Sequence, residues 1–502
     1  MIRGILYSSI LVNLVLIFGK MTGFIREVLV ANVYGTSAKA DVAVLLLTLP
    51  DLLVTILVGG AISSALIPLF SQNTNSASKL AMQSSCLLFF FFSIISIFLI
   101  LNIDTLFGIL SPDLNDKKIE QYSIYMYVVI ASLPLSVITG VFSAYQQSNE
   151  RFFLSSLGTV VFNITVIFGL IYLFYSNSDD LLFLSYILLF AALIRLLFQF
   201  FSSGVKLSDL DLKNWIVDKS VIIRYFQALG AGFLVVLFPI TTRSYISMHG
   251  EGYLAMFNYA MRLVELPLMF SVTILSIILL PKLSRSFVND KIEHLQYIKF
   301  GFQLTLSLTI CLCFVLFTSS SIFVKLIYGE GIGESDIAII SYIVSLGTIF
   351  SIFQALNSFL VVVSNSRGNT SLPIKIYSLG FILLNLILLI IGRSSSVLTL
   401  MCILGGINAF CFLLNIFFFK VEGFKFRMIF EDPLFVTVSI LVPFLWFFFG
   451  NYILVSNFSI LLKIILILFF ILFWLLSLAF SHHDLRQLIL RKLRIELSIY
   501  NK

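Results

Sequence analysis

The chain has 502 residues, of which 59% are hydrophobic and 11% are charged. A soluble globular protein carries roughly 25% charged residues, and no soluble core of this length could bury so much apolar surface. The net charge of +7 would favour a nucleic-acid partner in a soluble protein, but the basic residues here lie in short loops between apolar runs. Composition therefore excludes a soluble, nucleic-acid-binding protein and predicts an all-α polytopic membrane protein.

Fourteen apolar segments follow one another along the chain, and each can cross a bilayer, which takes a helix of roughly 20 residues. The first segment follows one early basic residue, Arg3, and is too long for a signal peptide, so we expect it to be retained as a span. The expected spans are 5–33, 39–71, 78–109, 120–147, 154–176, 180–204, 221–248, 251–281, 297–321, 335–364, 371–392, 395–419, 433–454 and 457–480.

The orientation follows from the positions of the 32 Lys and Arg residues, which gather in cytoplasmic loops of membrane proteins. An even number of spans places both termini on one side, and most of the basic loop residues lie on that side. We therefore predict a multi-pass protein of the bacterial inner membrane with both termini in the cytoplasm. Residues 481–502 are interpreted as a basic cytoplasmic tail, a short amphipathic helix on the anionic inner leaflet.

The two halves of the chain resemble each other weakly. The pair Leu-Pro at 49–50 recurs at 266–267, and L-I-P-L-F-S at 66–71 recurs as L-L-P-K-L-S at 279–284. Each half begins on the cytoplasmic side, which indicates a parallel repeat of the kind found in transporters. The expected organisation is an N-terminal six-helix lobe over 1–204, a C-terminal six-helix lobe over 221–419, two additional transmembrane helices over 433–480 and the tail over 481–502.

Several charged residues lie inside the expected spans, where each costs about 2.5–3.5 kcal/mol at mid-bilayer. One interpretation is a cationic cavity that binds an anion, since Arg can bind phosphate oxygens bidentately. The alternative is mutual pairing, of Arg262 with Glu265 and of Arg26 with Glu27 or Asp41. The candidate substrate-binding residues are Lys20, Arg26, Asp41, Arg243, Arg262 and Glu265.

Arg195, inside the span 180–204, is interpreted as structural or as snorkelling to the interface. Candidate hinges are Pro50, Gly59, Gly60 and Pro267, because proline inside a helix removes a backbone hydrogen bond and glycine weakens the helix.

Motifs of enzymes are missing from the sequence. No P-loop, H-E-x-x-H, G-x-S-x-G or C-x-x-C occurs, and the four histidines and five cysteines show no spacing typical of a metal site. We therefore expect no enzyme, no metal and no cofactor.

Two regions carry a resemblance to a family. G-F-I-R-E at 23–27 with A-D at 40–41, and N-Y-A-M-R-L-V-E-L-P at 258–267, resemble MurJ/MviN proteins, lipid II flippases of the multidrug/oligosaccharidyl-lipid/polysaccharide exporter superfamily. The resemblance implies two six-helix lobes that open alternately to the two sides, with the last two spans forming a groove for a polyprenyl tail. It places Lys20, Arg26 and Asp41 on essential charged positions of the family, and Arg262 on a cavity arginine.

The second span departs from the family. Residues 49–60, L-P-D-L-L-V-T-I-L-V-G-G, lack the paired basic residues and the acid that the family has there. The family's sodium site is not carried over, because 371–419 contain no acid.

The expected function is to flip a polyprenyl-diphosphate-linked saccharide, foremost lipid II, from the cytoplasmic to the periplasmic leaflet. The alternatives are a flippase for an O-antigen, capsule or exopolysaccharide unit, a cation-coupled drug exporter, and a non-transporting scaffold. A drug exporter should have an acidic cavity, and a scaffold does not explain buried charges. The expected partners are the lipid-linked saccharide and membrane lipids, with cell-wall synthesis proteins as candidates, and we expect a monomer.

Overall fold

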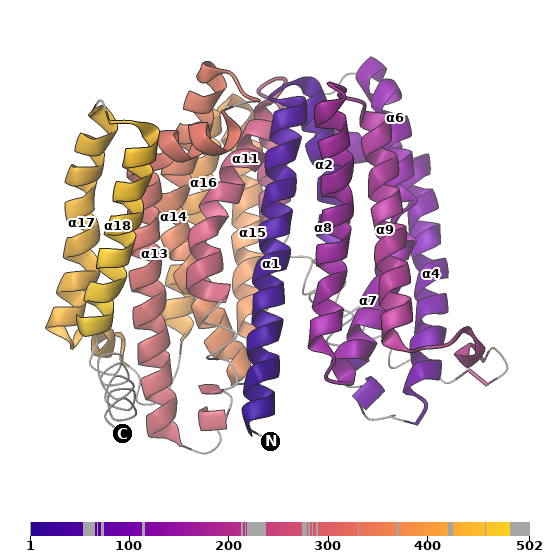
Figure 1. The fold of residues 1–502 in the computed structure, drawn as a ribbon, viewed down its shortest axis with the longest axis horizontal. Helices are drawn as coiled ribbons and strands as arrows, with labels where there is room; N and C mark the ends of the chain where they lie inside the picture. The colour runs from indigo at the N-terminus through magenta and orange to yellow at the C-terminus, as the bar shows by residue number, and fades with distance from the viewer. Residues whose placement is uncertain are drawn as a thin grey trace, which may run out of the picture. The chain divides into compact units, whose positions relative to one another are not determined.

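All secondary-structure elements assigned in the described part of the chain are helical (Figure 1). This agrees with the predicted all-α class. The structure, a computed structural model, describes residues 2–53, 66–67, 69–71, 75–112, 116–211, 214–215, 217, 237–273, 279, 282–283, 285–287, 290–329, 331–367, 371–419, 425–456 and 458–481.

Ten helical stretches among the described residues are long and apolar enough to cross a membrane. They coincide with the third to sixth and the ninth to fourteenth of the expected spans, so the hydropathy pattern predicted these helices correctly. They are α4 (Ala77–Leu101), α6 and α7 together (Asp116–Ile130 and Leu133–Ser148), α8 (Phe152–Tyr175), α9 (Leu181–Ser203), α13 (Lys291–Tyr328), α14 (Glu334–Ser366), α15 (Ser371–Ile391), α16 (Val397–Phe418), α17 (Pro433–Val455) and α18 (Ile460–Ser481).

Helices also occupy the described parts of the other four expected spans. They are α1 (Ile2–Tyr34), α2 (Ala38–Leu53), the helical residues 237–247, and α11 (Tyr253–Leu268). Short helical elements fill some connections: α5 (Ile103–Leu110), η2 (Leu207–Asp209), η4 (Gly392–Ser394) and η5 (Phe426–Phe430).

The ends of the helices follow from local sequence. The carboxylate of Asp180 accepts a hydrogen bond from the backbone N–H of Leu182 at 2.8 Å, and α9 ends at Gly204, whose φ of +80° suits glycine. Asp432 caps α17 in the same way, with Pro433 at the first helical position.

The two candidate prolines lie inside helices. Pro50 lies in α2, which continues to Leu53. Pro267 is the second-last residue of α11, and a π-helical segment, η3 (Met269–Thr273), follows this helix. A π-helical segment next to a proline marks an interruption of regular α-helical hydrogen bonding, as the sequence predicted for this position. Gly59, Gly60 and residues 482–502 of the tail lie outside the described residues.

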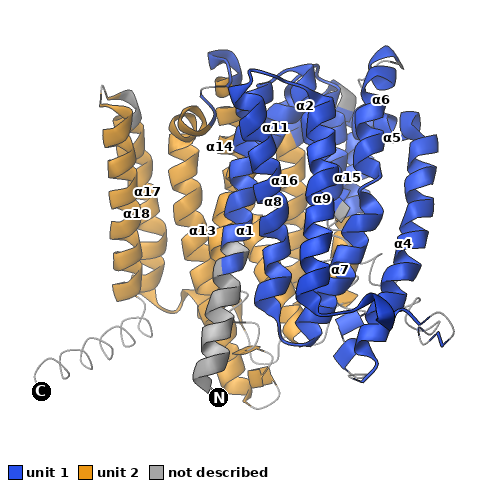
Figure 2. Ribbon diagram, turned by 45° about the vertical axis from the view of Figure 1, so that its right-hand side comes forward, with its two compact units in different colours: residues 1–259, 328–336, 381–400 blue, residues 260–327, 337–380, 401–502 orange. Residues whose placement is uncertain are grey.

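Packing divides the chain into two compact units, which Figure 2 shows in two colours. Unit 1 comprises residues 1–259, 328–336 and 381–400, and unit 2 comprises 260–327, 337–380 and 401–502. In unit 1, α8 packs against α1, α7 and α9, and α2 packs against α1, α6, α7 and α9. The lobes expected over 1–204 and 221–419 were defined by the sequence repeat and not by packing, so they stay a prediction.

The core of unit 2 is apolar and aromatic. Trp446 of α17 stacks on Phe470 of α18 with ring centroids 4.3 Å apart, and its indole Nε1 donates to the Thr318 hydroxyl at 3.0 Å. These contacts join the last two helices to α13. Both helices remain largely exposed and apolar, since only 28% and 11% of the most apolar stretches of α17 and α18 are buried and their mean hydropathies are 2.0 and 2.9. Such a surface requires lipid as its solvent.

Candidate functional site

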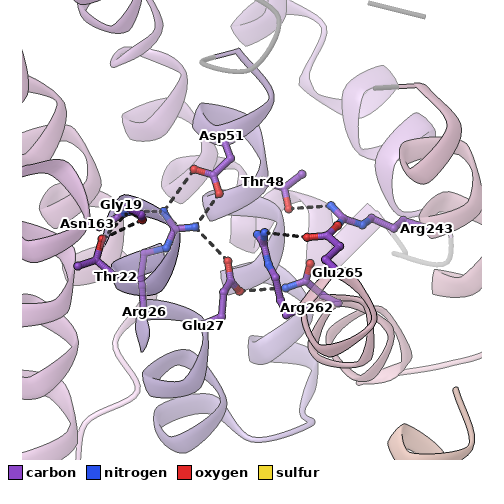
Figure 3. Close-up of polar contacts among 11 residues, drawn as sticks. Gly19, Thr22, Arg26, Glu27, Thr48, Asp51, Asn163, Arg243, Arg262 and Glu265 are labelled. Carbon is purple, nitrogen blue, oxygen red and sulfur yellow. Dashed lines mark hydrogen bonds and ion pairs between the residues drawn. The ribbon is translucent and has the colours of Figure 1, made fainter. Parts of the chain in front are cut away.

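Arg26 of α1 lies at the centre of a buried polar cluster in unit 1 (Figure 3). Its Nη2 is 2.6 Å from Asp51 Oδ2, and its Nη1 is 3.3 Å from Asp51 Oδ1. Nη2 also donates to Glu27 Oε1 at 3.0 Å. The guanidinium thus forms a bidentate pair with Asp51, the arrangement it would also form with a phosphate group.

Amide side chains hold this cluster from two other helices. Asn163 of α8 accepts from Arg26 Nη1 at 3.2 Å and donates its own Nδ2 to the carbonyl of Gly19 at 3.1 Å. Asn258 of α11 donates to Glu27 Oε2 at 3.0 Å. The amides therefore orient both Arg26 and Glu27, and this orientation leaves little freedom for either side chain.

Burial differs sharply within the cluster. Arg26, Glu27, Asn163 and Asn258 are each 4% exposed or less. The side chain of Asp51 is 37% exposed. Asp51 is therefore the most accessible of these five side chains.

Arg195 of α9 belongs to the same region of unit 1. It is 4% exposed, which excludes the snorkelling predicted as one option. Its Nη2 contacts the Thr159 hydroxyl at 3.4 Å, a long hydrogen bond, and its buried Nε has no hydrogen-bond partner among the described residues.

Asp41 has a different environment from the one expected. Its Oδ2 accepts the backbone N–H of Gly252 at 2.6 Å, and its Oδ1 accepts that of Ala255 at 2.7 Å. It therefore caps the start of α11, where unpaired N–H groups and the helix dipole favour a carboxylate. Among the described carboxylates, Arg26 donates hydrogen bonds to Glu27 and Asp51. The predicted pairing with Glu27 is therefore confirmed, and Asp51 takes the place that was considered for Asp41.

The remaining candidates are more accessible. Arg262 and Glu265, in unit 2, form an ion pair at 3.8 Å with side chains 29% and 49% exposed, as their i, i+3 spacing predicted. Arg243 is half-buried, with Nη1 3.5 Å from the Thr48 hydroxyl, and Lys20 is exposed on α1. Their substrate-binding roles stay predictions.

Sequence reasoning did not select Asp51, Asn163 or Asn258 as site residues. The only signal for Asp51 was a charged residue after Pro50 inside a span. Asn163 stands singly in an apolar run, and Asn258 begins the motif at 258–267 that carries the family resemblance. Among the residues that the structure describes, no group of three or more His, Cys, Asp or Glu side chains could hold a metal ion.

Solved structures define the class of this fold. A lipid II flippase MurJ in an inward closed conformation superposes with a TM-score of 0.80 at 18% identity, covering 95% of this chain and 99% of that one. An inward-facing MATE family multidrug transporter of the MOP superfamily gives a TM-score of 0.67 at 13% identity, covering 82% and 96%. The chain therefore shares the fold of these two polytopic helical membrane proteins.

Sequence comparison identifies the family. The profile of the family described as Lipid II flippase MurJ matches residues 30–473, and the chain belongs to this family. A probable lipid II flippase MurJ from Aquifex aeolicus is 24% identical over 379 residues, which is 73% of this chain and 74% of that protein. One from Buchnera aphidicola subsp. Schizaphis graminum is 24% identical over 466 residues, or 88% and 90%. The family resemblance seen in the motifs is thus confirmed.

Proposed function

We propose that this protein flips lipid II from the cytoplasmic to the periplasmic leaflet of the bacterial inner membrane by alternating access. Family membership supports this function, and the observation that carries it in the structure is the buried Arg26 cluster of unit 1. A guanidinium this well buried makes strong interactions with an anion, because little water screens it. Flippases of this family are transporters, which agrees with the absence of enzyme motifs in the sequence.

The diphosphate of the substrate is the group that Arg26 would bind. Arg262 is a second proposed substrate arginine and Lys20 a further one, with Arg243 as a weaker candidate. Glu265 would hold Arg262 in the absence of substrate. For Asp41 we propose an indirect role, because both of its oxygens cap α11.

The membrane potential can drive the movement. The cell interior is negative, so outward transfer of an anion is favourable by about 2.3 kcal/mol per charge per 100 mV. Two diphosphate charges would gain about 4–5 kcal/mol. Cations of the protein that move with the substrate would reduce this gain.

The proposed architecture has fourteen spans, two six-helix lobes over 1–204 and 221–419, the helix pair over 433–480 and cytoplasmic termini. The ten apolar helices and the helices α1, α2 and α11 in the expected positions support it. The polyprenyl tail would remain in the bilayer beside α17 and α18, whose outward faces are apolar.

A second candidate substrate is another lipid-linked glycan, such as an O-antigen, capsule or exopolysaccharide unit. The sequence at 49–60, which lacks charges typical of the family, is the observation that favours it. The diphosphate chemistry would be the same and the saccharide would differ.

Complementation tests the function. The chain is expressed in cells depleted of their own lipid II flippase, alongside Arg26→Ala, Arg262→Ala and Arg151→Ala, the last a matched control at an exposed position. We expect the wild type and the control to restore growth and the other two variants to fail. If a well-expressed, correctly inserted wild type fails, lipid II is not its substrate, and surface polysaccharides become the leading candidates.

A further inference from the structure

Asp51 occupies the position that a substrate phosphate would need on Arg26. Both of its oxygens face the guanidinium, at 2.6 and 3.3 Å, so the carboxylate satisfies the two donors that would bind a phosphate. The diphosphate therefore cannot form the bidentate contact while Asp51 remains in place. For a phosphate to bind the Nη1 and Nη2 donors of Arg26 together, one of the two described carboxylates must leave them.

The two carboxylates differ in how firmly they are held. Glu27 is 1% exposed, and its second oxygen accepts from Asn258 at 3.0 Å. Asp51 is 37% exposed and follows Pro50, which cannot donate to the carbonyl one turn earlier in α2. Greater exposure and a weaker helix both favour movement of Asp51, while Glu27 stays.

The charge balance of the cluster also depends on Asp51. Arg195 contacts Thr159, one helical turn before Asn163 on α8, so the region holds Arg26, Arg195, Glu27 and Asp51, with two positive and two negative charges. When the carboxylate leaves, these four positions lose their neutrality and a net positive charge remains in a buried region. A buried uncompensated charge is costly, so the region then favours an incoming anion.

We propose that Asp51 is an internal competitor of the substrate, a carboxylate that pairs with Arg26 in the empty protein and is exchanged for the diphosphate on binding. This inference rests on the proposed function and adds a residue that sets affinity. Between transport cycles the carboxylate of Asp51 balances the positive charge of Arg26. When it returns to Arg26 it displaces the diphosphate, and this promotes release of the product. The diphosphate and Asp51 thus bind in alternation.

The test compares binding of farnesyl diphosphate, with farnesol as the uncharged control, by calorimetry on the purified full-length protein in nanodiscs. Asp51→Asn keeps the shape of the side chain and removes its charge. We expect about tenfold tighter binding of farnesyl diphosphate, as expected for loss of a competing interaction of about 1.4 kcal/mol. Asp104→Asn, an exposed acid elsewhere in unit 1, is the matched control and should bind as wild type does.

Tighter binding is a result that structural damage would not produce. If the wild type binds the diphosphate and a folded Asp51→Asn binds equally or more weakly, the inference is overturned while the proposed function stands. If neither the wild type nor any variant binds the diphosphate in preference to farnesol, the proposed function fails as well.

If Asp51→Asn does not fold, a second measurement still tests the inference. Infrared difference spectra of the wild type on adding farnesyl diphosphate should show a carboxylate band shifting as a side chain leaves its arginine. Asp51→Ser, a smaller neutral variant, should bind more tightly and lack this band. An unchanged carboxylate region in a wild type that binds the ligand would overturn the exchange.

Discussion

Asp41 of α2 accepts the backbone N–H of Ala255 at 2.7 Å, so a residue at the start of one helix caps the start of another more than two hundred positions later. The same carboxylate also accepts from Gly252 at 2.6 Å. This geometry assigns Asp41 to the support of α11, the helix that carries Asn258 and therefore orients Glu27.

Asp41→Ala should therefore destabilise the protein without removing a direct substrate contact. Loss of a charged cap costs about 2 kcal/mol, so the thermal midpoint should fall by several degrees while the Kd for farnesyl diphosphate stays within a few-fold of wild type. Thermal unfolding and calorimetry on the same sample measure both. A variant of unchanged stability that no longer binds would instead identify Asp41 as a direct ligand.

Asn163→Ala should weaken substrate binding by about tenfold, because the amide orients the guanidinium of Arg26 and its loss leaves a buried donor less well satisfied. Asn385→Ala is the matched control, since the Asn385 amide donates to the Phe381 carbonyl of its own helix, α15. Equal affinities for the two variants would contradict the role of Asn163 in positioning Arg26.

Gly252→Ala should disrupt packing at the start of α11. A Cβ there would lie 1.9 Å from the carbonyl oxygen of Thr36, and its φ of +84° disfavours any other residue. Thr36 donates to the carboxylate of Asp336, so cysteines at these two positions should cross-link in the parent protein and less in Gly252→Ala.

The control for this experiment is Gly108→Ala, where a Cβ meets nothing within 4 Å. It should leave the cross-linking yield unchanged, and the single-cysteine variants should give no cross-link. A yield in Gly252→Ala equal to that of the parent would show that the α1–α2 turn tolerates the methyl group.

A membrane potential should accelerate flipping. In proteoliposomes, an imposed potential of about 100 mV, negative on the side from which lipid II moves, should raise the rate, because two diphosphate charges gain about 4–5 kcal/mol. Reversing its sign should slow the same movement. Rates that are independent of the potential would mean that the protein's cations travel with the substrate and cancel its charge.

Hydropathy predicted the positions of the ten apolar helices because lipid leaves the backbone no alternative to the helix. The proline at 267 indicated a break in the helix, and a π-helical segment begins two residues later, at Met269. The partners of Arg26 could be predicted from the sequence only in part, because Glu27 is adjacent in the chain whereas Asn163 is 137 positions away. Tertiary packing brings such residues together, and one sequence carries no periodic signal for it.

Asp51 and Asp41 show most clearly what could not be predicted from the sequence. Both are acids in the same expected span, and the family resemblance drew attention to Asp41. The structure places Asp51 on the buried arginine and Asp41 on the start of α11. Which acid faces the arginine depends on how α2 packs against α1, and the composition of the span does not determine this.

The most direct test of the central claim is lipid II translocation by the purified protein in proteoliposomes, measured as the fraction of labelled lipid II that becomes accessible to an external reagent. Translocation is predicted for the wild type and for Arg151→Ala, and not for Arg26→Ala. If Arg26→Ala, properly folded, translocates lipid II as fast as the wild type does, the buried arginine cluster is not the substrate site.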